Sequence, residues 1–416
     1  MKKPILFLLV FYSILFSFAQ DQKDQFIQDF LIQNLDSLGK DIVENPQKYR
    51  LQIIYTQIDR DKNNLPSFQT HHFRTELKEY FYPASTVKLF ASALSLEKIN
   101  QLNIKALDKY DIMLTDSVYK GQTAVKVDTT AENGFPSIAH YIKKILVTSD
   151  NDAYNRLYEF LGQKDFNNKL KAKGFDDVRI THRLSISLSQ DENKHTNPVR
   201  FIDRKSNKPL FTQNAQFSQQ DFTKPSDIFL GKAYLKGDEL INTPMNFKDK
   251  NAASLVDLHQ LLLRLIFHEK FKTTEQFDLT ETDYHFLLQY MSQLPRETVF
   301  PDYSQIPDNY CKFLMFGDKD DEEIPNHIRV FNKIGDAYGF TIDNAYIIDL
   351  KNNIEFALSA VIYTNDNETL NDGEYEYKET AWPFMGVLGR AFYRYELDRK
   401  REFTPDLTKF KFNYDK

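Results

Sequence analysis

The sequence predicts a two-lobed α/β (α+β) fold, in which an antiparallel sheet from both chain ends, flanked by helices, lies beside a mainly helical lobe. Runs typical of β-strands occur near both ends of the chain, whereas helical patterns dominate its middle. The chain has 416 residues and an apolar fraction of 41%, enough to bury a sizeable core. A cleft between the lobes would be the natural place for a functional site.

The first 19 residues are typical of a cleaved secretory signal peptide. Two lysines precede an apolar run, which ends in the small residues that a signal peptidase needs. A membrane anchor is the alternative, but the run is short for a span and lacks a basic flank on its C-terminal side. We therefore expect a mature chain of residues 20–416, secreted across the inner membrane and periplasmic, with no stable membrane span.

The sheet lobe is expected at about 24–84 and 326–396. Its first part begins with the helical pattern DQFIQDFLIQNLDSLGKDIVE, and continues with two strand-like runs, LQIIYTQID and SFQTHHFR. Its second part contains the runs HIRVFNKIG, DNAYIIDL and EFALSAVIY, the last two joined by the turn KNN. The run AWPFMGVLGRAFYRY then predicts a closing helix.

The helical lobe is expected at about 85–325. From Ser85 onward, apolar residues recur at helical spacing. An insertion at about 198–250 begins with NPVRFIDRKSNKPLFTQ, which could form a hairpin arm, and continues with a long polar stretch.

Composition and motifs exclude several classes of function. The formal net charge is −6, so the sequence gives no sign of a nucleic-acid partner. Cys311 is the only cysteine, which excludes an internal disulfide, and a buried thiol is the simplest interpretation. There is no HExxH or CxxC motif, and His71 with His72 is best explained as a strand pair, so we expect neither a metal nor another cofactor.

The stretch YPASTVK places Ser85 three residues before Lys88, at the start of a helical pattern. The spacing alone is weak, since it recurs at Ser37, Ser95 and Ser117. At a helix start, however, amide donors favour negative charge, and Lys88 falls one turn on along the same face. A poorly solvated lysine has a lowered pKa and could accept the serine proton for acyl transfer. The alternative is a capping serine followed by a solvated lysine.

A second polar group, Ser149-Asp150-Asn151, lies between two apolar helical runs and therefore on a connecting turn. Ser149 could relay a proton to a leaving group, and the Asn151 amide offers a donor and an acceptor to a substrate or to the lysine. A helix cap is the alternative interpretation.

A third group, Lys333-Ile334-Gly335, ends a β-run. The Lys333 ammonium could bind a carboxylate, and Gly335 leaves room for another backbone or a substrate. The amide of Asp336 could face an oxyanion. The alternative is a strand followed by a tight turn.

In this order, the three motifs resemble those of the class A serine β-lactamases and the related penicillin-binding proteins. The resemblance covers most of the mature chain and implies a β-lactamase-like fold. It implies an oxyanion hole formed by the amides of Ser85 and Asp336. The side-chain roles that it implies are acylated nucleophile for Ser85, proton acceptor for Lys88, proton relay for Ser149, contact to substrate and lysine for Asn151, and anion binding for Lys333.

The sequence departs from the family pattern in two places. Ile334 replaces the hydroxyl residue that would bond a substrate carboxylate, which puts recognition of a penicillin-type acid in doubt. The loop HRLSISLSQDENKHTNP lacks the expected E-x-x-L-N segment, and Glu192 matches a structural glutamate of the family rather than its catalytic one. We therefore expect fast acylation and slow release.

The resemblance implies an exported serine hydrolase that forms an acyl-enzyme from a small-molecule β-lactam or a related amide or ester. One alternative is an enzyme of the DD-peptidase type, whose substrate is a cell-wall peptide. Another is a penicillin-binding sensor module that is acylated, or only occupied, with little turnover.

Overall fold

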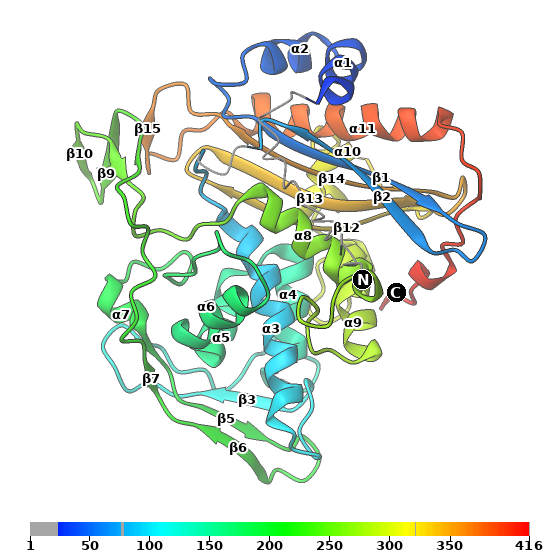
Figure 1. Cartoon of the computed structure of the whole chain (residues 1–416). Helices are drawn as coiled ribbons and strands as arrows, with labels where there is room; N and C mark the ends of the chain where they lie inside the picture. The colour runs from blue at the N-terminus through cyan, green and yellow to red at the C-terminus, as the bar shows by residue number, and fades with distance from the viewer. Residues whose placement is uncertain (1–23, 76–78, 321, 416) are drawn as a thin grey trace, which may run out of the picture.

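The computed structural model describes residues 24–75, 79–320 and 322–415 (Figure 1). The predicted signal peptide lies outside the described residues. Figure 1 shows a sheet with helices on both faces and a largely helical body beside it. This confirms the predicted fold class.

The main sheet is antiparallel and has five strands in the order β12-β13-β14-β1-β2. β1 pairs with β14, with Gln52 opposite Val361, so the two chain ends meet in the middle of the sheet as predicted. The edge strand β12 carries the third predicted motif. The strand bounds are β1 Gln52–Arg60, β2 Pro66–Phe73, β12 Ile328–Ala337, β13 Phe340–Asp349 and β14 Ile354–Tyr363.

Three helices cover one face of the sheet (Figure 1): α1 (Gln25–Asn34), α2 (Ser37–Glu44) and α11 (Trp382–Asp398). The continuous N-terminal helical pattern is therefore divided in two. The Asp36 side chain accepts a hydrogen bond from the Gly39 amide (2.9 Å) and so starts a second helix.

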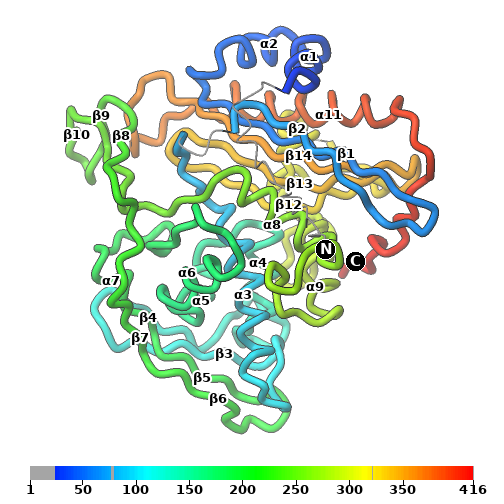
Figure 2. The backbone as a smooth tube through the Cα atoms, viewed as in Figure 1, coloured from blue at the N-terminus to red at the C-terminus, as the bar shows by residue number. Residues whose placement is uncertain are grey.

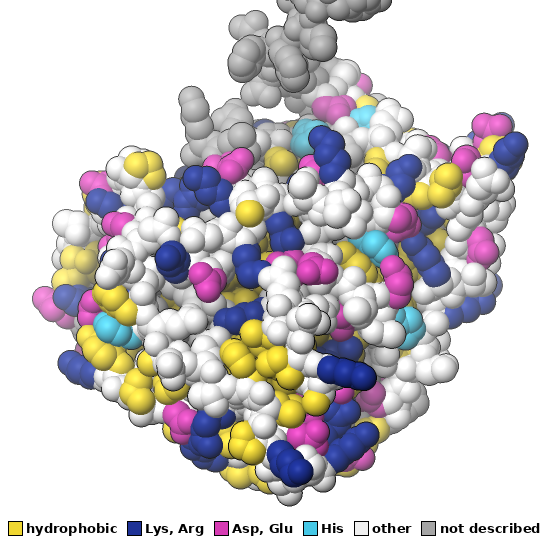
Figure 3. Space-filling view, turned by 60° about the horizontal axis from the view of Figure 1, so that its bottom comes forward, with side chains coloured by type: hydrophobic (Ala, Val, Ile, Leu, Met, Phe, Trp, Pro, Cys, Tyr) yellow, Lys and Arg dark blue, Asp and Glu magenta, His cyan; other side chains and the backbone are white. Residues whose placement is uncertain are grey.

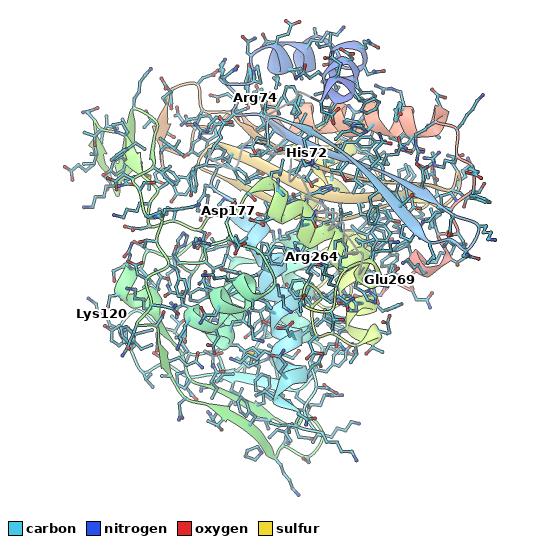
Figure 4. All side chains as sticks on the ribbon, viewed as in Figure 1. His72, Arg74, Lys120, Asp177, Arg264 and Glu269 are labelled. Carbon is cyan, nitrogen blue, oxygen red and sulfur yellow. The ribbon has the colours of Figure 1, made fainter. Side chains whose placement is uncertain are left out.

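The opposite face packs on α8 and the helical lobe (Figure 1). Arg264 of α8, labelled in Figure 4, donates to the carbonyl oxygen of Lys173 (2.6 Å) and lies over the Phe175 ring. It therefore ties α8 to the segment after α6. The helices of this part are α3 Val87–Leu102, α4 Ile138–Thr148, α5 Asn151–Leu161, α6 Gln163–Ala172, α7 Gln190–Lys194, α8 Leu255–Ile266 and α9 Glu281–Ser292. The short helix α10 (Phe313–Phe316) packs against α11 instead.

The expected insertion forms short strands that belong to four small sheets. β5 and β6 make a hairpin that extends β3, and β9 pairs in parallel with β15, a segment more than 130 residues further along the chain (Figure 2). The bounds are β3 Ile112–Thr115, β4 His195–Thr196, β5 Val199–Ile202, β6 Pro209–Gln213, β7 Gln216–Phe217, β8 Phe229–Leu230, β9 Ala233–Lys236, β10 Glu239–Ile241, β11 Met245–Asn246 and β15 Thr369–Leu370.

Charges are interspersed on the face seen in Figure 3, where Lys and Arg side chains alternate with Asp and Glu. Among the described residues, no three His, Cys, Asp or Glu side chains are grouped in a way that could hold a metal ion. No helix in this part of the chain combines the length and the apolarity needed to cross a membrane.

Candidate active site

Ser85 lies in a short 3₁₀ turn, Ala84–Thr86, that leads directly into α3. The Thr86 amide donates to the carbonyl oxygen of Pro83 (3.1 Å) and closes this turn. Ala84 has a φ of 47°, a conformation that costs a non-glycine residue energy and is often found at functional sites. The N-cap of α3 is Thr86, without a side-chain cap bond, so Ser85 does not serve as its cap.

Two cavities meet at Ser85. The smaller cavity, of about 350 Å³, has aromatic walls that include Tyr82, Tyr338 and Tyr375, and the larger has a volume of about 550 Å³. Ser85, Asn151 and Asp336 line both cavities. A substrate with its reacting carbonyl at Ser85 can therefore place one arm on each side.

Lys88 is fully buried one turn after Ser85, so the alternative of a solvated lysine is wrong. Its Nζ donates to the carbonyl oxygen of Ser149, to Ser149 Oγ (3.2 Å) and to Asn151 Oδ1 (2.7 Å). Burial, reinforced by the nearby Lys333 ammonium, holds the pKa of Lys88 well below its usual range. Within the described residues, no hydrogen bond joins Lys88 Nζ to Ser85 Oγ.

The Ser149-Asp150-Asn151 group forms the turn between α4 and α5. Ser149 ends α4 with a φ of 60°, and the Asp150 side chain caps α5 by accepting from the Ala153 amide (2.8 Å). Of the three residues that could have been a helix cap, Asp150 is therefore the one whose side chain acts as a cap. Because Asp150 caps α5, the side chains of Ser149 and Asn151 remain available to contact Lys88.

Lys333 reaches the same serine from β12. Its Nζ donates to Ser149 Oγ (2.8 Å) and to the carbonyl oxygen of Ile334 (2.9 Å), and burial lowers the pKa of Lys333 to about 8. Ser149 Oγ thus lies between the ammonium groups of Lys88 and Lys333. This arrangement can pass a proton between a base and a leaving group.

Gly335 allows the strand to approach the serine turn. A Cβ added there would lie 2.9 Å from the Ser85 amide nitrogen and 3.0 Å from the carbonyl oxygen of Pro83. Only a residue without a side chain permits this distance. The backbone of β12 is therefore held directly against the residue expected to react.

We expect Gly335→Ala to slow acylation by displacing Ser85, at a cost in stability of about 1–3 kcal/mol from overpacking. The matched control is Gly39→Ala, since a Cβ at Gly39 would lie 2.8 Å from Leu35 Cβ, between α1 and α2. Thermal unfolding and the rate of covalent labelling are measured for both variants. A Gly335→Ala protein that labels as fast as the parent would contradict this account of the close approach.

The Asp336 side chain is a site residue that the sequence interpretation missed, because only its backbone amide was considered. Its Oδ2 accepts a hydrogen bond from Trp382 Nε1 (3.0 Å), and burial raises the pKa of Asp336 to about 7. Ile334 also lines the larger cavity, at the position where the resemblance expects a hydroxyl. Alternation along the strand was the available signal, since it places residues 334 and 336 on the same side.

Arg183 connects the two ends of the loop at 183–195, which lies between α6 and β5. The Arg183 side chain donates to the carbonyl oxygens of His195 (2.9 Å) and Glu192 (3.4 Å) and to Glu159 Oε1 (3.0 Å). Its backbone amide donates to Asn193 Oδ1 (3.0 Å). The two ends of the loop are therefore held together, as in a compact Ω-loop.

Glu192 is a capping residue. Its Oε2 accepts hydrogen bonds from the Ser189 amide (2.8 Å) and Ser189 Oγ (2.7 Å), and it lines neither cavity beside Ser85. In the same loop, Ser185 Oγ accepts from Asn151 Nδ2 (2.8 Å). A hydroxyl, and not a carboxylate, therefore faces the Asn151 amide.

The insertion supports one wall of the smaller cavity. Asn371 lines this cavity directly after β15, and its Nδ2 donates to the carbonyl oxygen of Leu235 in β9 (3.2 Å). Phe247, also in the insertion, packs against the rings of Tyr82 and Tyr338. The sequence could not place the insertion relative to the site, because β15, the strand that pairs with β9, is distant in the chain.

Solved structures similar to this chain include β-lactamases. One, from a halotolerant bacterium, is 12% identical, with 85% of this chain and 98% of that chain covered and a TM-score of 0.47. Another, a class A β-lactamase of the last common ancestor of Gram-negative bacteria, is 14% identical, with coverages of 86% and 100% and a TM-score of 0.46. A third, from Desulfarculus baarsii, is 13% identical, with coverages of 84% and 94% and a TM-score of 0.43.

A search of curated proteins gives no match. The sequence model of the beta-lactamase enzyme family matches residues 40–395, which include all three motifs and most of the chain. The predicted family resemblance is therefore confirmed. This chain belongs to the beta-lactamase enzyme family.

Proposed function

We propose that the chain is an exported, periplasmic serine hydrolase that forms an acyl-enzyme at Ser85 from a β-lactam or a related amide or ester. The observation that carries the proposal is the shared Ser149 hydroxyl, which lies within hydrogen-bond distance of both buried lysines, Lys88 and Lys333. A buried lysine with a lowered pKa can be neutral near pH 7 and so act as a base.

In the proposed acylation, neutral Lys88 accepts the Ser85 Oγ proton while Oγ attacks the substrate carbonyl carbon. The amides of Ser85 and Asp336 would stabilise the resulting oxyanion. The C–N or C–O bond of the substrate then breaks, and the leaving atom takes a proton from Lys88 through Ser149. Lys88 returns to its neutral form, and water must later hydrolyse the Ser85 ester.

The deacylation step distinguishes the proposed hydrolase from a slow-release penicillin-binding module. The segment at 185–190, SISLSQ, contains no carboxylate, and Glu192 is held in a cap. These observations favour fast labelling followed by slow release. A cell-wall peptide remains the alternative substrate, with a β-lactam as its mimic.

The proposal is tested by incubating the purified protein with a chromogenic cephalosporin and with a fluorescent penicillin. Product release and covalent label at Ser85 are followed together, the latter by peptide mass. Catalytic release supports a hydrolase, whereas stable label at Ser85 without release supports the slow module. A peptide-release assay with a cell-wall stem peptide then identifies the DD-peptidase alternative. Absence of label and hydrolysis with these two acids and with an uncharged ester probe alike would contradict acyl transfer at Ser85.

We expect Glu192→Gln to release product as slowly as the parent, because the Glu192 carboxylate caps a helix and lines neither cavity beside Ser85. Stopped-flow hydrolysis of the parent and the variant should show the same burst and the same weak steady state. Efficient turnover in the parent that disappears in the variant would show that Glu192 is a deacylating base.

A further inference from the structure

The lining of the larger cavity beside Ser85 includes one positively charged side chain, while Lys88 and Lys333 reach the cavity only through the Ser149 hydroxyl. The charged side chains in its lining are Asp320, Asp336 and Lys378, and the Lys378 side chain is exposed. Aromatic and aliphatic groups form much of the remaining wall, including Tyr310, Phe313, Ile334 and Trp382. Asp320 and Lys378 are both exposed and of opposite charge, so the carboxylate that a substrate carboxylate would meet in the wall of this cavity is Asp336.

The lysine that the sequence assigns to anion binding does not line either cavity. Lys333 is 2% exposed, and its Nζ is bonded to Ser149 Oγ and to the carbonyl oxygen of Ile334. Its ammonium group therefore lies behind Ser149. The neighbouring residue is Ile334, so the hydroxyl that would bond a substrate carboxylate beside Lys333 is absent.

Asp336 is the acidic residue that the linings of both cavities share. Gly335 brings β12 against the Ser85 amide, and the next side chain lines both cavities where they meet. The hydrogen bond from Trp382 Nε1 to Oδ2 fixes the orientation of this carboxylate. When Asp336 is ionised, its negative charge at this point disfavours a second negative charge from a substrate.

We propose that Asp336 is a specificity-determining residue that makes the larger cavity reject substrates carrying a carboxylate and accept uncharged amides or esters. The inference rests on the proposed function, because it concerns the acyl donors that react with Ser85. It assigns to this chain a substrate class different from that of an acidic penicillin.

The test compares two probes that differ only in one group, a fluorescent penicillin with a free carboxyl group and its methyl ester. The second-order rate of Ser85 labelling is measured at pH 8, above the pKa of about 7 of Asp336, so that the side chain is charged. We expect the parent to react faster with the ester. In Asp336→Asn, the acid-to-ester rate ratio should rise about tenfold or more, since the repulsive charge is removed.

The control is Asp320→Asn, which makes the same chemical change in the same cavity at an exposed residue. Its acid-to-ester ratio should stay within about threefold of the parent ratio. Asp336→Ser is measured as a second uncharged variant, so that the result does not depend on the folding of one protein. Asparagine retains an acceptor for Trp382 Nε1.

The outcomes separate this inference from the proposed function. A parent that reacts faster with the acid, or a ratio that is unchanged in both Asp336 variants, overturns the inference while acyl transfer at Ser85 stands. An equal rise in Asp320→Asn overturns the assignment to Asp336. No labelling of Ser85 by either probe contradicts the proposed function and the inference with it. A higher acid-to-ester ratio in both Asp336 variants, without a rise in Asp320→Asn, supports the inference.

Discussion

Ser85→Ala is expected to abolish covalent labelling by every acylating probe, because it removes the only oxygen that can form the ester. The fold should be retained. Ser85 does not cap α3, and it lines two cavities, so losing its hydroxyl should change the free energy of unfolding by no more than about 0.5 kcal/mol. Intact-protein mass after incubation with a fluorescent penicillin measures the label, and thermal unfolding measures stability.

The matched control for this variant lies on the same helix. Ser95→Ala changes a serine that also stands three residues before a lysine, but Ser95 is buried in the core and lines neither cavity beside Ser85. It should label at the parent rate. Label that still attaches to the Ser85→Ala protein would show that the nucleophile has been misassigned.

Lys88→Met is expected to slow acylation by about 10²–10⁴-fold, the usual contribution of a positioned general base. Methionine keeps the approximate length of the side chain but cannot accept a proton. The parent rate should rise with pH as Lys88 loses its proton, and this rise should occur well below the usual lysine pKa, because burial lowers the pKa of Lys88. In Lys88→Met this rise should disappear. Single-turnover labelling across pH measures both effects.

Lys98→Met is the corresponding control, since Lys98 follows Ser95 at the same spacing and burial lowers its pKa to about 8. Its Nζ donates to Gln213 Oε1 (2.7 Å), away from the cavities beside Ser85. Its acylation rate and pH profile should match those of the parent. A Lys88→Met rate within a few-fold of the parent would mean that Lys88 has only a structural role.

Much of the fold could be predicted because periodicity and local signals agree with the final packing. The strands on either side of KNN and the pairing of N- and C-terminal runs follow from alternating or continuous apolar patterns. The N-terminal helix was predicted as one element, because apolar spacing continues across Asp36. A single cap bond, donated by the Gly39 amide to the Asp36 side chain, divides it, and periodicity does not report such bonds.

The candidate site likewise has a part that could be predicted from the sequence and a part that could not. The positions of Ser85, Ser149 and Lys333 at a helix start, a turn and a strand were predictable from local patterns. The hydrogen bonds that join them depend on three-dimensional packing, and so does the burial of Lys88, which decides whether it can be a base. Only the side chain of Asp336 was missed, because the motif drew attention to its backbone amide and a charged side chain after a strand is usually solvated.

The closure by Arg183 has a consequence for how this protein can change over evolutionary time. The Arg183 side chain holds the far end of the loop mainly through the carbonyl oxygens of Glu192 and His195, which any residue type would provide. The residues at 185–190 can therefore be replaced without opening the loop. Under the proposed acyl transfer, a point substitution here would add a carboxylate opposite Asn151 and so change the rate of product release, on one unchanged scaffold.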